Sequence, residues 1–352
     1  MNKKITWIMP ETNKLFNDRA RVSCTDKPEF VQAKNTVHQV SLTLFTDCNL
    51  SCKFCYEFNR SPIDANTFSY NSLVQKYEDV IKKTDKNTIF VSLLGGELLQ
   101  DKFSNLMFEK YGELVDKIRE ITAKYNKQCV IGISSNLIHV KRERIIKLCI
   151  EKDISLYASF DPTERFSNAN QFEVFIENLL IYKLHGIKII SEVILSKSNI
   201  SALYNENNIG AKYFDKVYKI TDGNIIFNAF STNEHNQFSD NELSEKEQGL
   251  FLVWLYKKYS KLQELSDLKD DINKKLIKTT SMCFNTFIYE NKIVWTCCEP
   301  NAYITHIKNH KCFLCKYFKI CKAGVCVRVY HMNEDCHRKE IYEYFESIGY
   351  SI

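Results

Sequence analysis

The feature that most restricts the fold of this chain is an alternation of short β-rich runs with longer amphipathic stretches, from near His38 to about residue 230. The β-rich runs cover residues 39–45, 88–94, 129–134, 154–160, 187–195 and about 224–230. The amphipathic stretches cover about 67–84, 101–126, 140–151, 170–184 and 198–208. Strands that alternate with helices form right-handed βαβ units and a parallel sheet. We therefore predict an α/β fold built on a partial (β/α)6 parallel barrel, with its active site at the C-terminal ends of the strands.

Changes in composition divide the chain into four predicted parts. Residues 1–37 have little periodicity and form an N-terminal extension, and residues 38–235 form the partial barrel. Residues 236–270 contain one strong helix over 243–262, which Ser244 and Glu247 begin with the spacing of a capping box. Residues 271–352 combine short strands with dense cysteines. We predict a small cysteine-rich domain there.

The overall charge and hydropathy exclude several classes of protein. The 48 basic and 43 acidic residues give a net charge of +5, too mild to indicate a nucleic-acid partner. No run approaches the roughly 20 apolar residues of a membrane span, and the start lacks the apolar core of a signal peptide. We expect a cytoplasmic protein with no membrane partner. Thiols stay reduced in that compartment, so clustered cysteines indicate metal sites.

Of the 14 cysteines, three form a first group directly after the first predicted strand. Cys48, Cys52 and Cys55 have the spacing C-x3-C-x2-C. Three thiolates in one loop can bind three irons of a 4Fe–4S cluster and leave the fourth iron free for a small molecule. The alternatives are a zinc site or unrelated buried cysteines. A structural zinc site takes four ligands, and no fourth cysteine or histidine lies nearby.

With Tyr56 behind it, this segment resembles the signature of the radical S-adenosylmethionine (radical SAM) superfamily. The resemblance implies that the amino and carboxyl groups of S-adenosylmethionine chelate the open iron. Reduction of the cluster would then cleave the sulfonium and yield a 5′-deoxyadenosyl radical. Cys48, Cys52 and Cys55 would be both the metal ligands and the catalytic residues, and Tyr56 would contact the adenine.

Polar clusters follow the next predicted strands. After the second strand, Gly95 and Gly96 let backbone amides approach a ligand closely, and Glu97 can accept a hydrogen bond from an ammonium group. A similar family motif binds the methionine end of the cofactor, although an ordinary tight turn is the alternative. By the same resemblance, Ser135 and Asn136 at the end of the third strand would contact the ribose of the cofactor, and Ser159 and Asp161 at the end of the fourth would lie near the cofactor and substrate. The position of Glu192 and Leu195 in the fifth strand makes them further cofactor-binding candidates. Glu192 faces either the barrel mouth or solvent, and only Asp161 and Glu192 are candidates for a general base.

A second cysteine group spans residues 283–336. Its members are Cys283, Cys297, Cys298, Cys312, Cys315, Cys321, Cys326 and Cys336. Iron–sulfur clusters and zinc sites both use four thiolates, so spacing alone does not separate them.

The segment resembles the SPASM domain of radical SAM enzymes. The resemblance implies an outer auxiliary cluster at Cys312, Cys315, Cys321 and Cys336, and an inner one at Cys283, Cys297 and Cys326. Cys298 is either a further ligand or a hydrogen donor.

Two features depart from the SPASM pattern. Four residues separate Cys321 from Cys326 where the family has three. The family glycine before the second cysteine is missing, and Asn291 is the residue that could replace it in a tight hairpin. Both departures concern the local geometry of the auxiliary sites.

By resemblance, a chain with these two parts is an oxidoreductase-type maturase that modifies a carbon of a ribosomally synthesised peptide. The enzyme alternatives are formylglycine formation of the anaerobic sulfatase-maturating type, a peptide epimerase and a small-molecule dehydrogenase. The non-enzyme alternative is a zinc-ribbon interaction protein. The expected partners are a peptide or protein substrate, an electron donor such as flavodoxin or ferredoxin, and a separate leader-binding protein.

Overall fold

The computed structural model describes the barrel region and a few segments beyond it. The described residues are 37–52, 54–55, 63–67, 70–163, 165–166, 168–229, 241, 243–262, 265, 269, 285–289, 292–295 and 337–350. The predicted extension, apart from Val37, and the whole second cysteine group lie outside these ranges.

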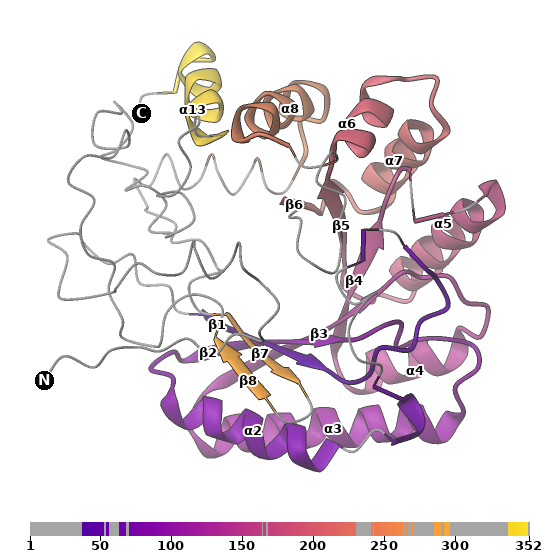
Figure 1. Ribbon diagram of the computed structural model, residues 1–352, viewed down its shortest axis with the longest axis vertical. Helices are drawn as coiled ribbons and strands as arrows, with labels where there is room; N and C mark the ends of the chain where they lie inside the picture. The colour runs from indigo at the N-terminus through magenta and orange to yellow at the C-terminus, as the bar shows by residue number, and fades with distance from the viewer. Residues whose placement is uncertain are drawn as a thin grey trace, which may run out of the picture.

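Six parallel strands form a curled sheet, as the sequence predicts (Figure 1). They are β1 (Val37–Thr43), β2 (Thr88–Leu94), β3 (Gln128–Ser135), β4 (Ile154–Phe160), β5 (Ile189–Leu195) and β6 (Ile225–Ala229). Each strand pairs in parallel with the next one along the chain. The partial (β/α)6 barrel is confirmed, and the C-terminal ends of all six strands lie at one edge.

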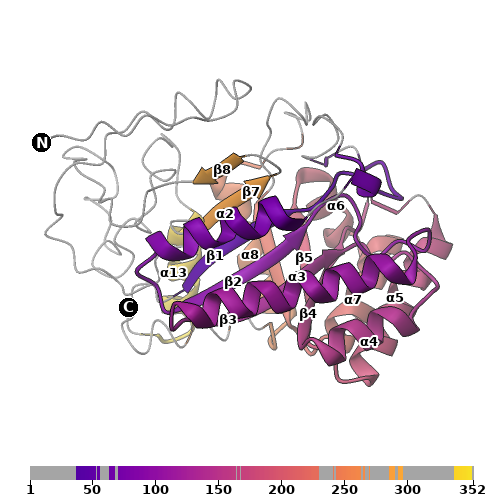
Figure 2. The same ribbon diagram turned by 90° about the horizontal axis from the view of Figure 1, so that it is seen from below.

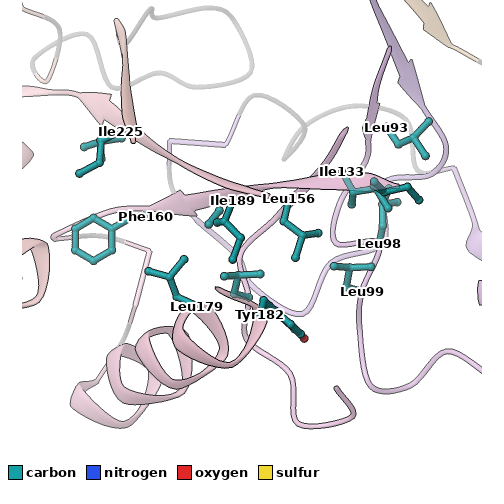
Figure 3. Packing of buried hydrophobic residues seen from close by; sticks show 14 of the residues in the cluster. Leu93, Leu98, Leu99, Ile133, Leu156, Phe160, Leu179, Tyr182, Ile189 and Ile225 are labelled. Atoms are coloured by element: carbon teal, nitrogen blue, oxygen red, sulfur yellow. The ribbon is translucent and has the colours of Figure 1, made fainter. Parts of the chain in front are cut away.

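Helices cover the convex face of this sheet (Figures 1 and 2). They are η1 (Ala65–Thr67), α2 (Tyr70–Lys83), α3 (Asn105–Lys124), α4 (Glu143–Glu151), α5 (Ala169–Leu184), α6 (Lys197–Tyr204) and α7 (Ile209–Ile220). Leu156 of β4 and Ile189 of β5 point toward Leu179 and Tyr182 of α5 (Figure 3). Side chains alternate along a strand, so the neighbours of Leu156 and Ile189 in sequence point to the concave face.

Helix α7 was not predicted. The sequence pattern indicated one helix over 198–208 and none between it and the sixth strand. The chain leaves the helical conformation at Asn205 and begins again at Asn208, whose side-chain oxygen accepts the Gly210 N–H at 2.7 Å. A Cβ on Gly210 would lie 2.1 Å from the Pro162 carbonyl oxygen. The glycine that weakens the helical signal is therefore required where α7 meets the loop after β4.

The segments after the barrel join it at two places. Strand β7 (Asn285–Tyr289) pairs in parallel with β1 and forms a hairpin with the antiparallel β8 (Lys292–Trp295), an extension of the sheet that was not predicted. Helix α8 (Glu245–Lys258) begins with the predicted capping box and lies beside α13 (His337–Ser347) (Figure 1). The domain boundaries remain a prediction. None of the helices in the described ranges is long and apolar enough to cross a membrane.

Candidate cluster and cofactor site

The three cysteines of the first group lie in the loop after β1, at the edge where the parallel strands end. Cys48 is exposed, Cys52 is buried and Cys55 is half-buried, and none of them is in a disulfide. The Cys55 N–H donates to the Cys52 carbonyl at 3.0 Å, so these two residues share a tight turn. The Leu50 N–H points to the Cys48 sulfur at 3.4 Å. The local backbone thus turns around the thiols.

The thiols are close enough for their charges to interact. The pKa of Cys48 is raised to about 11, mainly by desolvation of the thiol and also by negative charge on Glu97, Cys52 and Cys55, while the Leu50 N–H opposes the rise. Burial also raises the pKa of Cys52, while the positive charge of Arg165 opposes this rise. Thiols with raised pKa values are protonated at neutral pH, and a bound metal displaces these protons.

The donor set fits the predicted cluster. Among the described residues, no three His, Cys, Asp or Glu side chains converge on a point that a single metal ion could occupy. The ligands of a 4Fe–4S cluster do not have to converge on one point, because each thiolate binds a separate iron. Cys48, Cys52 and Cys55 would hold this group, as three thiols from one short loop that are not in disulfides.

The glycines after β2 pack closely against the chain that leads into Cys48, and their predicted approach to a ligand stays a prediction. A Cβ on Gly95 would lie 2.5 Å from the Phe45 carbonyl oxygen, and one on Gly96 would lie 2.1 Å from that of Asp47. The Gly96 and Glu97 amides donate to these same two carbonyls, each at 2.9 Å. The glycines therefore allow close contact with the chain that leads into Cys48, and both amides are already hydrogen-bonded within the protein.

Glu97 connects the turns after β2 and β3. Its carboxylate is 1% exposed and accepts hydrogen bonds from the Leu99 N–H and the Ser135 hydroxyl, both at 2.9 Å, and from the Asn136 N–H at 2.6 Å. Burial raises the pKa of Glu97, and these three donors oppose the rise. A carboxylate has about four acceptor positions, so one remains for the predicted ammonium contact.

Ser135 and Asn136 are also held inside the protein. The Ser135 hydroxyl oxygen accepts the Leu137 N–H at 3.0 Å. The Asn136 side chain donates to the Asn49 side chain at 2.8 Å and accepts the Ile138 N–H at 2.8 Å. Contact of either residue with a ribose stays a prediction.

Asp161 organises the loop after β4. Its carboxylate accepts the Thr163 N–H at 2.9 Å, the Arg165 N–H at 3.2 Å and the Asn199 side-chain amide at 2.7 Å. Asp161 is 1% exposed. This carboxylate is engaged with its own loop, and its role as a general base stays a prediction. Ser159 is half-buried on the concave side of β4.

The structure places Glu192 and Leu195 on opposite faces of β5. Glu192 alternates with the buried Ser191 and Val193, so it faces the concave side of the barrel. Burial raises its pKa, while Arg165 and the Asn228 side chain oppose the rise. Leu195 lies in the hydrophobic core, which leaves only its backbone for the predicted cofactor contact.

Sequence reasoning missed Arg165, which comes soon after β4. Its guanidinium carbon lies 5.2 Å from the centre of the Phe54 ring, inside the cysteine loop. Its charge favours the ionised forms of Cys52, Glu97 and Glu192, and its Nε is buried without a hydrogen-bond partner. A lone basic residue after a strand has no sequence pattern that would mark it as a site residue.

The other predicted site residues lie outside the described part of the chain. They are Tyr56, Cys283, Cys297, Cys298, Cys312, Cys315, Cys321, Cys326 and Cys336. Their roles at adenine and at auxiliary clusters stay predictions.

Comparisons with known proteins agree with this geometry. Residues 38–174 match a family model described as a 4Fe-4S single cluster domain. Native anSMEcpe with bound AdoMet superposes with a TM-score of 0.61 at 15% identity, covering 89% of this chain and 98% of that one. SuiB from Streptococcus suis, bound to S-adenosylmethionine, gives a TM-score of 0.50 at 14% identity over 86% of this chain and 75% of SuiB. The chain shares the fold of these two proteins. No curated protein matches it significantly in sequence. In this fold, the cysteine loop and the three strand-end turns described above lie at the C-terminal edge of the barrel.

Proposed function

We propose that this chain is an oxidoreductase-type radical SAM enzyme that modifies a carbon of a ribosomally synthesised peptide. The observation that carries the proposal is the loop of Cys48, Cys52 and Cys55 at the strand ends of a partial parallel barrel. Three thiols there match a cluster with one open iron.

Two solved structures with this fold support the peptide substrate. One is titled as anSMEcpe with AdoMet and the Cp18Cys peptide, at a TM-score of 0.60 and 14% identity, covering 88% of this chain and 96% of that one. The other is SuiB bound to its precursor peptide SuiA, at a TM-score of 0.50 and 14% identity, covering 84% and 73% of the two chains. These similarities extend to the fold, and the peptide substrate is our inference from them.

Three residues of this chain have separate roles in the proposed site. When bound, a reduced cluster with one open iron supplies the electron that cleaves S-adenosylmethionine. Glu97 has one acceptor position left for the ammonium group. Arg165 adds a positive charge beside Cys52 and Glu192. Glu192 faces the concave side, where a substrate side chain would enter.

Further proposed components lie outside the described residues. Seven of the eight cysteines between residues 283 and 336 would hold two auxiliary clusters in a SPASM-like domain, and Cys298 would be a further ligand or a hydrogen donor. An electron donor such as flavodoxin or ferredoxin would reduce the site, and a separate protein would present the leader of the substrate.

Anaerobic reconstitution tests the proposal. The reduced protein should convert S-adenosylmethionine to 5′-deoxyadenosine, and the Cys48→Ala/Cys52→Ala/Cys55→Ala variant should not. The variant should keep the iron of the auxiliary sites. A fully metallated wild-type protein that leaves S-adenosylmethionine intact would refute the proposal, and a colourless protein that contains zinc would favour the zinc-ribbon alternative.

The mass of the modified peptide separates the enzyme alternatives. A cross-link removes two hydrogens from the peptide. Formylglycine formation changes one cysteine or serine to an aldehyde, and epimerisation leaves the mass unchanged. Candidate peptides encoded beside this chain are the substrates to test, with liquid chromatography and mass spectrometry as the assay.

A further inference from the structure

Asn49, the residue directly after Cys48, contacts the turn after β3 through both ends of its side chain. Its Nδ2 donates to the Ile138 carbonyl at 2.8 Å, and its Oδ1 accepts Nδ2 of Asn136 at 2.8 Å. The Oδ1 of Asn136 in turn accepts the Ile138 N–H at 2.8 Å. These three hydrogen bonds form a closed ring that joins the cysteine loop to a turn nearly 90 residues later in the sequence.

This ring is anchored in the protein interior. Asn136 is 3% exposed, and its backbone N–H donates to Glu97 Oε2 at 2.6 Å. Glu97 is held in turn by the Ser135 hydroxyl and the Leu99 N–H. Asn49 itself is exposed. An exposed residue beside Cys48 is therefore tied to a buried network that spans the ends of β2 and β3.

The ring requires an amide at both positions. Asn49 donates with one end of its side chain and accepts with the other, which neither a carboxylate nor an alanine can do. The chain around Cys48 is irregular from Leu44 onward, so hydrogen bonds rather than secondary structure fix its course. Fixed partners of this kind orient a metal ligand and slow its dissociation.

We propose that Asn49 and Asn136 are positioning residues that hold Cys48 in place for the cluster. The proposal rests on the proposed function, because it requires Cys48 to be a cluster ligand. It also gives Asn136 a role besides the ribose contact that resemblance implies.

The test measures how fast the reconstituted protein loses iron to a chelator without oxygen. The variants are Asn49→Ala, Asn49→Asp and Asn136→Ala. The Cys48→Ala/Cys52→Ala/Cys55→Ala protein gives the iron loss from all other sites, which is subtracted. Asn168→Ala is the matched control, because Asn168 also makes a side-chain hydrogen bond to the backbone, capping α5 through the Gln171 N–H at 3.0 Å.

We expect the three ring variants to lose the cluster about ten- to hundredfold faster than wild type, as for residues that support metal ligands. Their reduced cluster should also show an altered electron paramagnetic resonance signal upon addition of S-adenosylmethionine. Asn168→Ala should lower the melting temperature and keep the wild-type rate of iron loss and the wild-type signal.

Two outcomes overturn the inference, and they differ in their cause. If wild type binds a cluster and Asn49→Ala and Asn49→Asp release it at the wild-type rate, the positioning role is refuted and the proposed function stands. If wild type contains no more iron than the triple cysteine variant, the proposed function fails and the positioning role fails with it.

Discussion

The substitution Gly96→Ala should disrupt the entrance to the cysteine loop. The added Cβ would lie 2.1 Å from the Asp47 carbonyl oxygen and 2.5 Å from that of Thr46, whereas real Cβ atoms essentially never approach closer than 3.0 Å. Both obstacles are backbone atoms, so no side-chain rotation relieves the clash. The two segments must separate by about 0.9 Å, the difference between 2.1 Å and 3.0 Å.

A separation of that size breaks the hydrogen bonds across the contact. The Gly96–Phe45 and Glu97–Asp47 bonds are both 2.9 Å long, and adding about 0.9 Å takes them beyond any useful length. Each of the two broken bonds leaves a backbone N–H without its partner, which costs about 1–3 kcal/mol. We expect the free energy of unfolding to fall by about 2–6 kcal/mol, a large part of the roughly 5–15 kcal/mol of a typical domain.

The assay is urea unfolding of the reduced apoprotein followed by far-ultraviolet circular dichroism, with iron per chain measured after reconstitution. Gly112→Ala in α3 is the matched control. There the nearest atom is the flexible end of Lys152, at 3.2 Å from the new Cβ, and alanine in a helix gains up to about 1 kcal/mol over glycine. A Gly96→Ala protein with the same midpoint and iron content as Gly112→Ala would refute the reasoning.

Two further predictions concern buried polar groups. Burial raises the pKa of Glu192 in the folded protein. As pH rises, the unfolded chain therefore loses the carboxyl proton of Glu192 at a lower pH than the folded protein does. Above the ordinary pKa of glutamate, Glu192 then lowers the free energy of unfolding. The gain in urea midpoint of Glu192→Gln over wild type should therefore be larger at about pH 7 than at about pH 4, and an equal difference at both values would contradict this. Tyr182→Phe removes the hydroxyl bonded to His139 Nε2, whose ring already has an unpartnered Nδ1. The melting curve should show a loss of about 1–3 kcal/mol. Tyr213→Phe should lose less, because the Tyr213 hydroxyl donates to the exposed carboxylate of Glu173 at 2.5 Å, which water can satisfy instead. Equal losses for the two variants would contradict the role of the Tyr182–His139 bond.

The sequence was sufficient for the barrel because every strand carries its own local signal. The runs at 88–94 and 154–160 coincide with β2 and β4, and most other strand ends differ by one or two residues. Helix α7 was missed because Gly210 weakens the helical pattern. The close contact with Pro162, which requires a glycine at this position, is visible only in the structure. The pairing of β7 with β1 was also not predicted, because local periodicity does not show which distant strands pair.

The sequence was enough to predict which residues lie at the candidate site. It was not enough to predict which atoms those residues contact. The spacing of the cysteines and the polar residues at strand ends located Glu97 and Asn136. Which atoms they bind is a tertiary property, and the structure shows hydrogen bonds within the protein. Arg165 and Asn49 were missed because a lone basic residue and a lone asparagine carry no pattern of their own.

These contacts change how the polar strand ends of the barrel should be understood. The cysteine loop is held by the Gly96 turn, by the Asn49–Asn136 ring and by Arg165 against Phe54. All three contacts are made between residues of the polypeptide, and together they frame the thiols. Residues in such a frame can resemble cofactor ligands in sequence while their main contacts are with the loop. Two measurements separate a frame residue from a cofactor ligand. Substitution of a frame residue should change the retention of iron, and substitution of a cofactor ligand should change the affinity for S-adenosylmethionine.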